Sequence, residues 1–230
     1  MTRLLKPELL DTLPPDNPEA ARSRADLRRV NWWMGHRPIL LRAMETAPLK
    51  SVRRIAELGA GDGTLALQLA QQLSAHWPTV ELTLVDQQPV VAAETLETFH
   101  NLGWNAHAVK ADIFTWLADE STSAHVIFAN LFLHHFDEAG LRQILRLAAA
   151  RCSYFVALEP KRHSLARLGC ELLWMIGCNR VTRHDARLSV QAGFRGGELS
   201  ALWPKAGNWT THERPTGVFS HLFIASRTSA

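Results

Sequence analysis

Between residues 52 and 160 the sequence alternates short apolar runs with longer amphipathic patterns, and this alternation limits the chain to few folds. Five runs have the length and apolar character of strands, and they cover residues 52–58, 80–86, 105–111, 125–133 and 153–160. Helical spacing of leucine and alanine separates them, most clearly in residues 138–152. Strands that alternate with helices at this spacing predict βαβ units and a mostly parallel sheet.

The segments on either side of this alternation have a different pattern. Two helical patterns precede the first strand, and Asn17 followed by Pro18 is typical of a helix start. They predict a helical cap over residues 1–50, followed by an α/β domain over residues 51–230. Near the end, two strand-like runs in residues 208–227 predict a hairpin, which implies an antiparallel edge or insertion in a parallel sheet.

Composition excludes several classes of protein. The hydrophobic content of 47% is enough for a sizeable core, and a net charge of +3 from 25 basic and 22 acidic side chains does not indicate nucleic-acid binding. The three cysteines have no metal or disulfide spacing, so we expect no metal site and a cytoplasmic protein. The first residues lack a signal-peptide pattern, and the longest apolar stretch, residues 168–178, contains Glu171 and is too short for stable membrane insertion.

A glycine-rich loop follows the first predicted strand and precedes a helix. Its glycines are Gly59, Gly61 and Gly63, and ligands of open parallel sheets bind at the carboxyl ends of strands. A dinucleotide loop requires the spacing G-x-G-x-x-G, whereas Thr64 occupies the sixth position here. No Gly-Lys-Ser/Thr follows, which excludes a phosphate-binding P-loop. The glycines alone are also compatible with a merely structural turn.

Acidic residues near three strand ends limit the class of ligand that could bind there. Glu57 would repel a pyrophosphate but suits a ligand that carries ammonium or sulfonium charge. Asp86 ends the second strand, where ribose hydroxyls can be bound, and Asp112 follows the third, where an adenine amino group can be met. Each of these two aspartates is alternatively a helix cap.

Taken in order, Glu57-Leu-Gly59-Ala60-Gly61-Asp-Gly63, Asp86 and Asp112 resemble the motifs of class I S-adenosylmethionine-dependent methyltransferases. The motifs span about residues 52–159, and the terminal hairpin extends the resemblance. The resemblance implies an α/β, Rossmann-like, seven-stranded, mostly parallel sheet with an antiparallel last strand and helices on both faces. The implied cofactor is S-adenosyl-L-methionine.

The same resemblance implies a role for individual residues. The glycine loop, with Ala60, would pass under the methionine part of the cofactor. Asp86 and its neighbour Gln87 would bind the ribose, and Asp112 with Ile113 would hold the adenine. Asn130 and Leu131, at the end of the fourth strand, would lie beside the methyl-transfer centre.

Histidines are the candidates for proton transfer. Methyl transfer is an in-line displacement that needs a base only when the nucleophile must lose a proton. His134 and His135 directly follow the fourth strand, and His184 stands beside Asp185. Either histidine of the pair could instead cap the next helix or pack against the cofactor, and residues 183–185 could be a solvated loop.

The acceptor is expected to be a small molecule and not a nucleic acid. No Asn-Pro-Pro-Tyr motif follows the fourth strand, and aromatic and basic residues are not interleaved. By resemblance, residues 160–205 would form the acceptor pocket. The His-Asp…Ser-Val…Ala-Gly-Phe…Glu-Leu run within them is similar to small-molecule methyltransferases related to polyketide and quinone modification, which implies a phenolic or quinol acceptor. The alternatives are an NAD-type oxidoreductase, disfavoured by Glu57 and Thr64, and a non-catalytic cofactor-binding protein. The sequence leaves the oligomeric state open.

Overall fold

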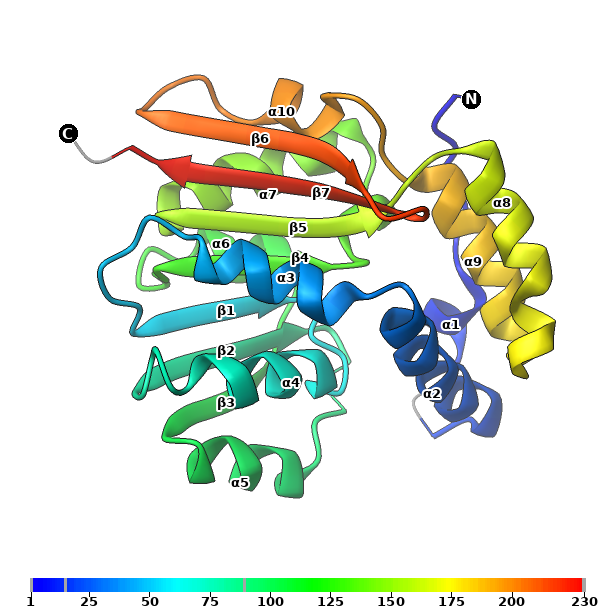
Figure 1. The fold of residues 1–230 in the computed structure, drawn as a ribbon, viewed down its shortest axis with the longest axis horizontal. Coiled ribbons are helices and arrows are strands. Elements are labelled where there is room, and N and C mark those ends of the chain that lie inside the picture. The colour runs from blue at the N-terminus through cyan, green and yellow to red at the C-terminus, as the bar shows by residue number, and fades with distance from the viewer. Residues whose placement is uncertain (1, 15, 89, 229–230) are drawn as a thin grey trace.

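The computed structural model describes residues 2–14, 16–88 and 90–228, and a single twisted sheet organises them (Figure 1). In this part of the chain the sheet has seven strands in the order β3-β2-β1-β4-β5-β7-β6. The strands are β1 (Arg54–Leu58), β2 (Val80–Asp86), β3 (Trp104–Lys110), β4 (Val126–Asn130), β5 (Tyr154–Pro160), β6 (Trp209–Thr216) and β7 (Ser220–Arg227). β1 to β5 pair in parallel, and β7 is antiparallel to both β5 and β6. The predicted seven-stranded sheet with an antiparallel last strand is confirmed.

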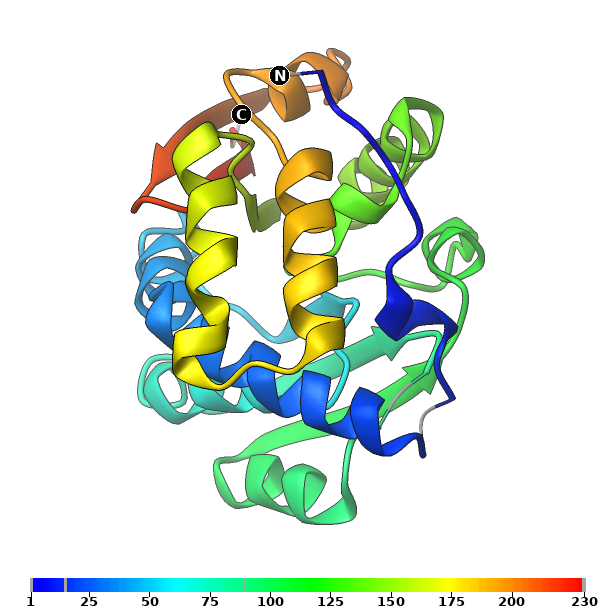
Figure 2. The same ribbon diagram turned by 90° about the vertical axis from the view of Figure 1, so that its right-hand side faces the viewer.

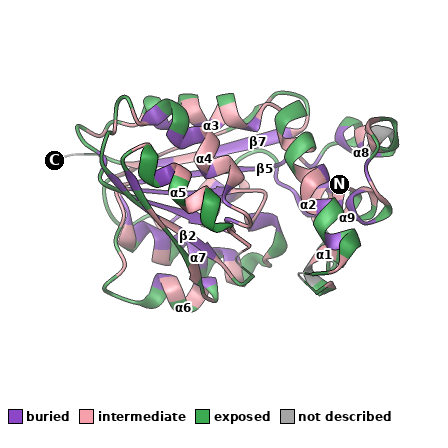
Figure 3. Ribbon diagram, turned by 90° about the horizontal axis from the view of Figure 1, so that it is seen from below, coloured by how far each residue is buried: buried purple, intermediate pink, exposed green. Residues whose placement is uncertain are grey.

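Helices cover both faces of the sheet (Figures 1 and 3). One face carries α3 (His36–Glu45), α4 (Thr64–Leu73) and α5 (Ala93–Asn101), and the other carries α6 (Ile113–Ala118), α7 (Glu138–Arg151) and α10 (Glu198–Leu202). Successive strand residues point to opposite faces, so Ile55 enters the first core and Ala56 the second. The strand order reverses between β1 and β4, and this switch point is where such sheets bind ligands.

The remaining helices gather beyond the carboxyl ends of the parallel strands (Figures 1 and 2). They are α1 (Leu9–Thr12), α2 (Pro18–Trp33), η1 (Leu133–His135), α8 (Ser164–Glu171), η2 (Leu172–Ile176) and α9 (Arg180–Ala192). The buried carboxylate of Asp26 joins α2 to the start of α9, because its Oδ2 accepts from the Asn179 N–H at 2.6 Å and the Thr182 hydroxyl at 3.1 Å. The boundary at residue 50 between a helical cap and an α/β domain stays a prediction.

Two helix starts illustrate how local chemistry sets this arrangement. Asn17 caps α2 as predicted, because its Oδ1 accepts the Glu19 N–H at 2.8 Å with Pro18 in the first turn. The interpretation of residues 183–185 as a solvated loop is wrong, since they lie inside α9. Asn179 caps α9 by accepting the Thr182 N–H at 2.8 Å, and this cap was not predicted from the sequence. No helix among the described residues has the length and apolar character needed to cross a membrane.

Gly193 offers a test of how the segment after β5 docks on the sheet. A Cβ at this position would lie 2.3 Å from the Pro160 carbonyl oxygen, which also accepts the Phe194 N–H at 2.9 Å. We expect Gly193→Ala to lower the free energy of unfolding by about 1–3 kcal/mol, as overpacking does. Gly197→Ala is the control, because nothing lies within 4 Å of its Cβ, and should change stability by less than about 0.5 kcal/mol. Equal effects in urea unfolding would contradict the packing explanation.

Candidate functional site

The glycine loop leaves β1 in a conformation that brings ligands to its backbone. Gly59 and Gly61 have φ angles of 72° and 54°, a region that L side chains rarely adopt. A Cβ on Gly59 would lie 2.3 Å from Cδ2 of Phe132, whereas a Cβ on Gly61 would meet nothing within 4 Å. Gly61 therefore faces open space at the switch point, and Gly59 is covered by an aromatic ring.

Asp86 connects the glycine loop to the loop after β2. Its Oδ2 accepts the Gly61 N–H at 2.9 Å, and its Oδ1 accepts the Gln88 N–H at 2.7 Å. The alternative that Asp86 caps the following helix is wrong, because Ala92 is the N-cap of α5. Asp86 therefore fixes the two loops that border the open space beside Gly61.

Asp112 does serve as a helix cap. Its Oδ1 accepts the Phe114 and Thr115 N–H groups at 3.0 and 3.1 Å, and its Oδ2 accepts from Nε2 of Gln87 at 3.2 Å. The Oδ2 atom thus joins the loops after β2 and β3. Ile113 is only 4% exposed and packs in the core, so its side chain presents little surface to a ligand.

The carboxyl group of Glu57 is buried and incompletely hydrogen-bonded. It is 3% exposed, and its Oε2 has no hydrogen-bond partner among the described residues. Burial raises the pKa of Glu57 well above its usual value, and the nearby charges of Asp62 and Asp86 add to this effect. A cationic ligand group would supply the missing partner, since burying an unpaired carboxylate is costly. The residues present therefore fit a positively charged cofactor.

The cap helices border the same region. Arg28 of α2 pairs with Asp62 of the glycine loop at 2.6 Å. His36, at the start of α3, is buried with Nε2 3.1 Å from Oγ of Ser220. Burial lowers the pKa of His36 to about 4, against smaller opposing effects of Asn130 and Glu159. Among the described residues, neither Nδ1 of His36 nor Oδ1 of Asn130 has a hydrogen-bond partner. Sequence reasoning did not identify His36 as a site residue.

A fully buried carboxylate organises the turn after β4. Glu159, on β5, accepts the Phe132 and Leu133 N–H groups on Oε1 at 3.1 and 2.8 Å, and the His134 N–H on Oε2 at 3.3 Å. Leu131, just before this turn, has a φ of 53°, which is strained for a residue with a side chain. The three hydrogen bonds hold the turn in this conformation.

The same carboxylate orients His134. Nδ1 of His134 lies 2.8 Å from Oε2 of Glu159. Burial by itself would raise the pKa of Glu159, but the hydrogen bond and charge of His134 and the backbone N–H groups hold it below its usual value. Glu159 is therefore an ionised acceptor, and Nδ1 of His134 donates to it.

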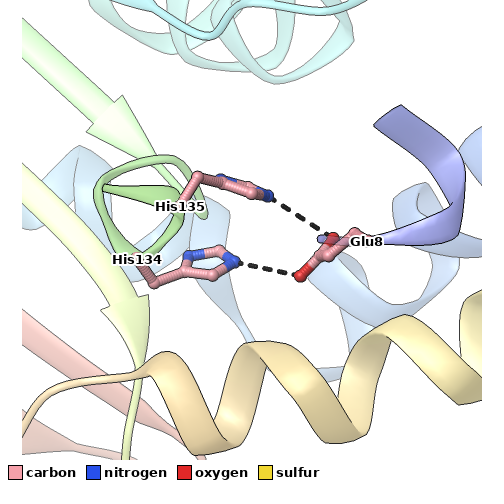
Figure 4. Close-up of side chains that lie close together, drawn as sticks. All are labelled: Glu8, His134 and His135. Carbon is pink, nitrogen blue, oxygen red and sulfur yellow. Dashed lines mark ion pairs between the residues drawn. The ribbon is translucent and has the colours of Figure 1, made fainter. Parts of the chain in front are cut away.

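Glu8 completes a cluster that the sequence did not reveal (Figure 4). Its Oε1 lies 3.5 Å from Nε2 of His134, and its Oε2 lies 3.4 Å from Nε2 of His135. Nδ1 of His135 contacts the Phe132 carbonyl oxygen at 2.9 Å. Burial opposes ionisation of Glu8, but the two imidazoles hold the pKa of its carboxyl well below the usual range.

The third candidate histidine lies apart from this cluster. His184, on α9, has a side chain that is 46% exposed, and its Nδ1 lies 2.9 Å from Oδ1 of Asp185. Asp185 accepts the Leu9 and Leu10 N–H groups at 2.8 and 3.0 Å. Asp185 therefore fixes α1, and with it the preceding Glu8, over η1.

A shallow hollow at the opposite edge of the sheet is not a candidate for this ligand. It measures about 510 Å³ and lies where β5 begins and β7 ends. Its lining residues are Pro48, Leu49, Ser153, Gly207, Asn208, Arg227 and Thr228. Ligands of open parallel sheets bind at the carboxyl ends of the strands, where the glycine loop and the histidines lie.

Comparison with known proteins identifies a related domain. Residues 55–153 match the family model described as a methyltransferase domain. The tRNA1(Val) (adenine(37)-N6)-methyltransferase of Shigella boydii is 35% identical over 88 residues, which cover 36% of this chain and 34% of that protein. The chain thus spans about a third of the length of the curated relatives it matches.

Solved structures share the fold over most of the chain. The plantazolicin methyltransferase BamL, in complex with a triazolic desmethylPZN analog and SAH, has a TM-score of 0.64 at 14% identity, covering 95% of this chain and 93% of that one. An O-methyltransferase family protein from Burkholderia thailandensis has a TM-score of 0.60 at 17% identity, covering 93% and 61%. The chain therefore contains a region that matches a methyltransferase domain, and it has the fold of solved S-adenosylmethionine-dependent methyltransferases.

Proposed function

We propose that this protein transfers the methyl group of S-adenosylmethionine to a hydroxyl group of a small aromatic acceptor, a phenol or a quinol, with His134 as the base. The observation that carries the proposal is the imidazole of His134, which Glu159 holds through Nδ1 and whose Nε2, 3.5 Å from the Glu8 carboxylate, makes no hydrogen bond among the described residues. A phenol with a pKa near 10 costs about 4 kcal/mol to ionise at pH 7. A positioned imidazole offsets this cost by accepting the proton.

Residues around the glycine loop would hold the cofactor, which supplies an activated methyl group when bound. Glu57 would pair with its ammonium group, and the backbone at Gly61 would pass beneath it. Asp86 and Gln87 would meet the ribose, and Asp112 the adenine. The unpartnered Oε2 of Glu57 supports this assignment, because a cationic group there removes the cost of the buried carboxylate.

A small-molecule acceptor is supported by observations other than the geometry of His134. The names of the fold relatives include an O-methyltransferase family protein and a plantazolicin methyltransferase. The relative that modifies tRNA matches only about a third of this chain, and the turn after Asn130 lacks the Asn-Pro-Pro-Tyr motif. A small-molecule acceptor is therefore favoured over a nucleic acid. The NAD-type alternative has no support, since Glu57 would face the pyrophosphate.

Asp86 tests the cofactor site. We expect Asp86→Ala to weaken S-adenosylmethionine binding about 10- to 100-fold, because hydrogen bonds to charged groups contribute about 1.5–3 kcal/mol. Asp119→Ala is the matched control, because Asp119 also accepts an N–H two residues ahead, at 2.9 Å from Ser121, but lies after α6. Calorimetry on both variants measures the difference. Unchanged affinity in Asp86→Ala would remove this residue from the site.

Glu57 tests the charge of the ligand through pH. In the cofactor-free fold its raised pKa means that its contribution to stability is present at acid pH and is lost as pH rises from 4.5 through that raised pKa. Glu57→Gln should therefore raise the thermal midpoint more at about pH 8 than at about pH 5, yet weaken cofactor binding by about 10-fold or more. The exposed Glu94→Gln should do neither. A rise in the thermal midpoint of Glu57→Gln that is equal at both pH values would contradict a raised pKa of Glu57.

His134 tests the base and separates an enzyme from a binding protein. With a phenol and quinol panel, His134→Gln should lower kcat by about 10²- to 10⁴-fold and leave cofactor affinity unchanged, because the imidazole acts only on the acceptor proton. His184→Ala should retain activity. Loss of activity in His184→Ala alone would move the proton transfer to that residue. A chain that binds the cofactor but methylates neither the panel nor tRNA would be a non-catalytic binder.

A further inference from the structure

Glu8, His134 and His135 form a cluster in which one possible ligand atom of each residue lies close to the others (Figure 4). We propose that these three side chains bind a divalent transition-metal ion, of which Zn²⁺ is the best match. One ligand atom from each residue lies within 4.8 Å of the others. The argument uses the geometry of the cluster and does not depend on the proposed methyl acceptor.

Hydrogen bonds on the far side of each ring determine which nitrogen holds a lone pair. The Phe132 carbonyl oxygen can only accept, so Nδ1 of His135 must donate to it. Oε2 of Glu159 already accepts the backbone N–H of His134, so Nδ1 of His134 donates to it as well. When each imidazole carries only this one proton, both Nε2 atoms have an electron pair for a ligand. That of His134 is buried and has no hydrogen-bond partner in the described residues.

In that state the Nε2 atoms point electron pairs at the Glu8 carboxylate, so a cation is needed between them, either a proton on the imidazoles or a metal ion. Their separations from the Glu8 oxygens, 3.5 and 3.4 Å, exceed the usual 2.7–3.2 Å of an N–H···O hydrogen bond. Metal bonds of about 2.0–2.2 Å in a tetrahedron place neighbouring ligand atoms about 3.3–3.5 Å apart. The two separations involve different oxygens of Glu8, and an ion held by one of these oxygens and both Nε2 atoms lies within the 4.8 Å that spans the three ligand atoms.

Each ligand has an outer partner that orients it, as in established metal centres. Glu159 and the Phe132 carbonyl oxygen hold the two rings, and the Ser189 hydroxyl donates to Oε1 of Glu8. The ring centroids lie 4.2 Å apart with the planes tilted by 33°, and both Nε2 atoms face Glu8 (Figure 4). The donors are thus oriented before an ion arrives.

The donor set selects the class of ion. Two imidazoles and one carboxylate suit Zn²⁺, Co²⁺ and related ions, whereas Mg²⁺ and Ca²⁺ prefer all-oxygen sites. Three protein ligands leave one position of a tetrahedron for water or another small ligand. The His135 side chain is 29% exposed, which gives an ion a route to the site. An ion on Nε2 of His134 would occupy the electron pair that a proton needs, so the metal and the base function exclude each other.

The test is a Co²⁺ titration of the tag-free, chelator-treated full chain, followed by visible absorption, with Zn²⁺ calorimetry for stoichiometry. We expect one ion per chain and the intense absorption of low-coordinate Co²⁺. Glu8→Gln and His135→Ala should weaken binding by about 100-fold or more, because loss of even an outer partner costs about 10- to 100-fold. The exposed His212→Ala is the control and should bind as the parent does.

Two outcomes overturn the proposal. Without saturable Co²⁺ binding, or with equal binding in Glu8→Gln, the cation between the facing atoms is a proton on an imidazole. Glu8 is the primary variant because it lies on the peripheral segment before α1, whereas a change at buried His134 risks misfolding. Calorimetry with S-adenosylmethionine on the same samples tests the proposed function separately. Cofactor binding without metal binding overturns only the metal site, and metal binding without cofactor binding overturns the proposed function. Binding of both supports the metal site and overturns the role of His134 as the base.

Discussion

The carboxylate of Glu159 collects four donors in a place with no access to water, and the rest of the site is arranged around it. Three backbone N–H groups and the imidazole of His134 bind its two oxygens. An ionised group in such a position is stable only when its hydrogen bonds are complete. Completing them forces the chain to turn sharply after β4, and this turn places Leu131 in its strained conformation and both histidines at the carboxyl edge of the sheet.

Glu57 and Glu159 stand at equivalent places, near the carboxyl ends of β1 and β5, and are equally buried, yet their pKa values shift in opposite directions. Glu159 is surrounded by donors from its own chain. Glu57 has an oxygen without a partner and two further carboxylates nearby. The first therefore stabilises the fold in its ionised form. The second is suited to a positively charged molecule from outside, in keeping with the sulfonium and ammonium groups of the cofactor of this family.

The fold was predictable from the sequence because its signals are local, and the residues proposed to hold the cofactor rest on local signals as well. Periodicity predicted the strands, and the glycines and acids lie within a few residues of the strand ends that position them. The acceptor side was not predictable in the same way. Glu8 meets His134 across more than a hundred residues, and His36 reaches Ser220 from the far end of the chain. Such contacts follow from tertiary packing, for which a single sequence has no short-range signature.

The placement of β7 between β5 and β6 has a consequence for how the molecule assembles. During synthesis β6 emerges before β7, but it has no partner until β7 has paired with β5. The outer edge of β5 stays open until then, and open edges are where nascent chains aggregate. Ser220, which contacts His36, and His221, which lies opposite Glu159, both belong to that final strand. Maturation of the acceptor side therefore coincides with closure of the sheet, and a partly synthesised chain would have a glycine loop but no finished histidine turn.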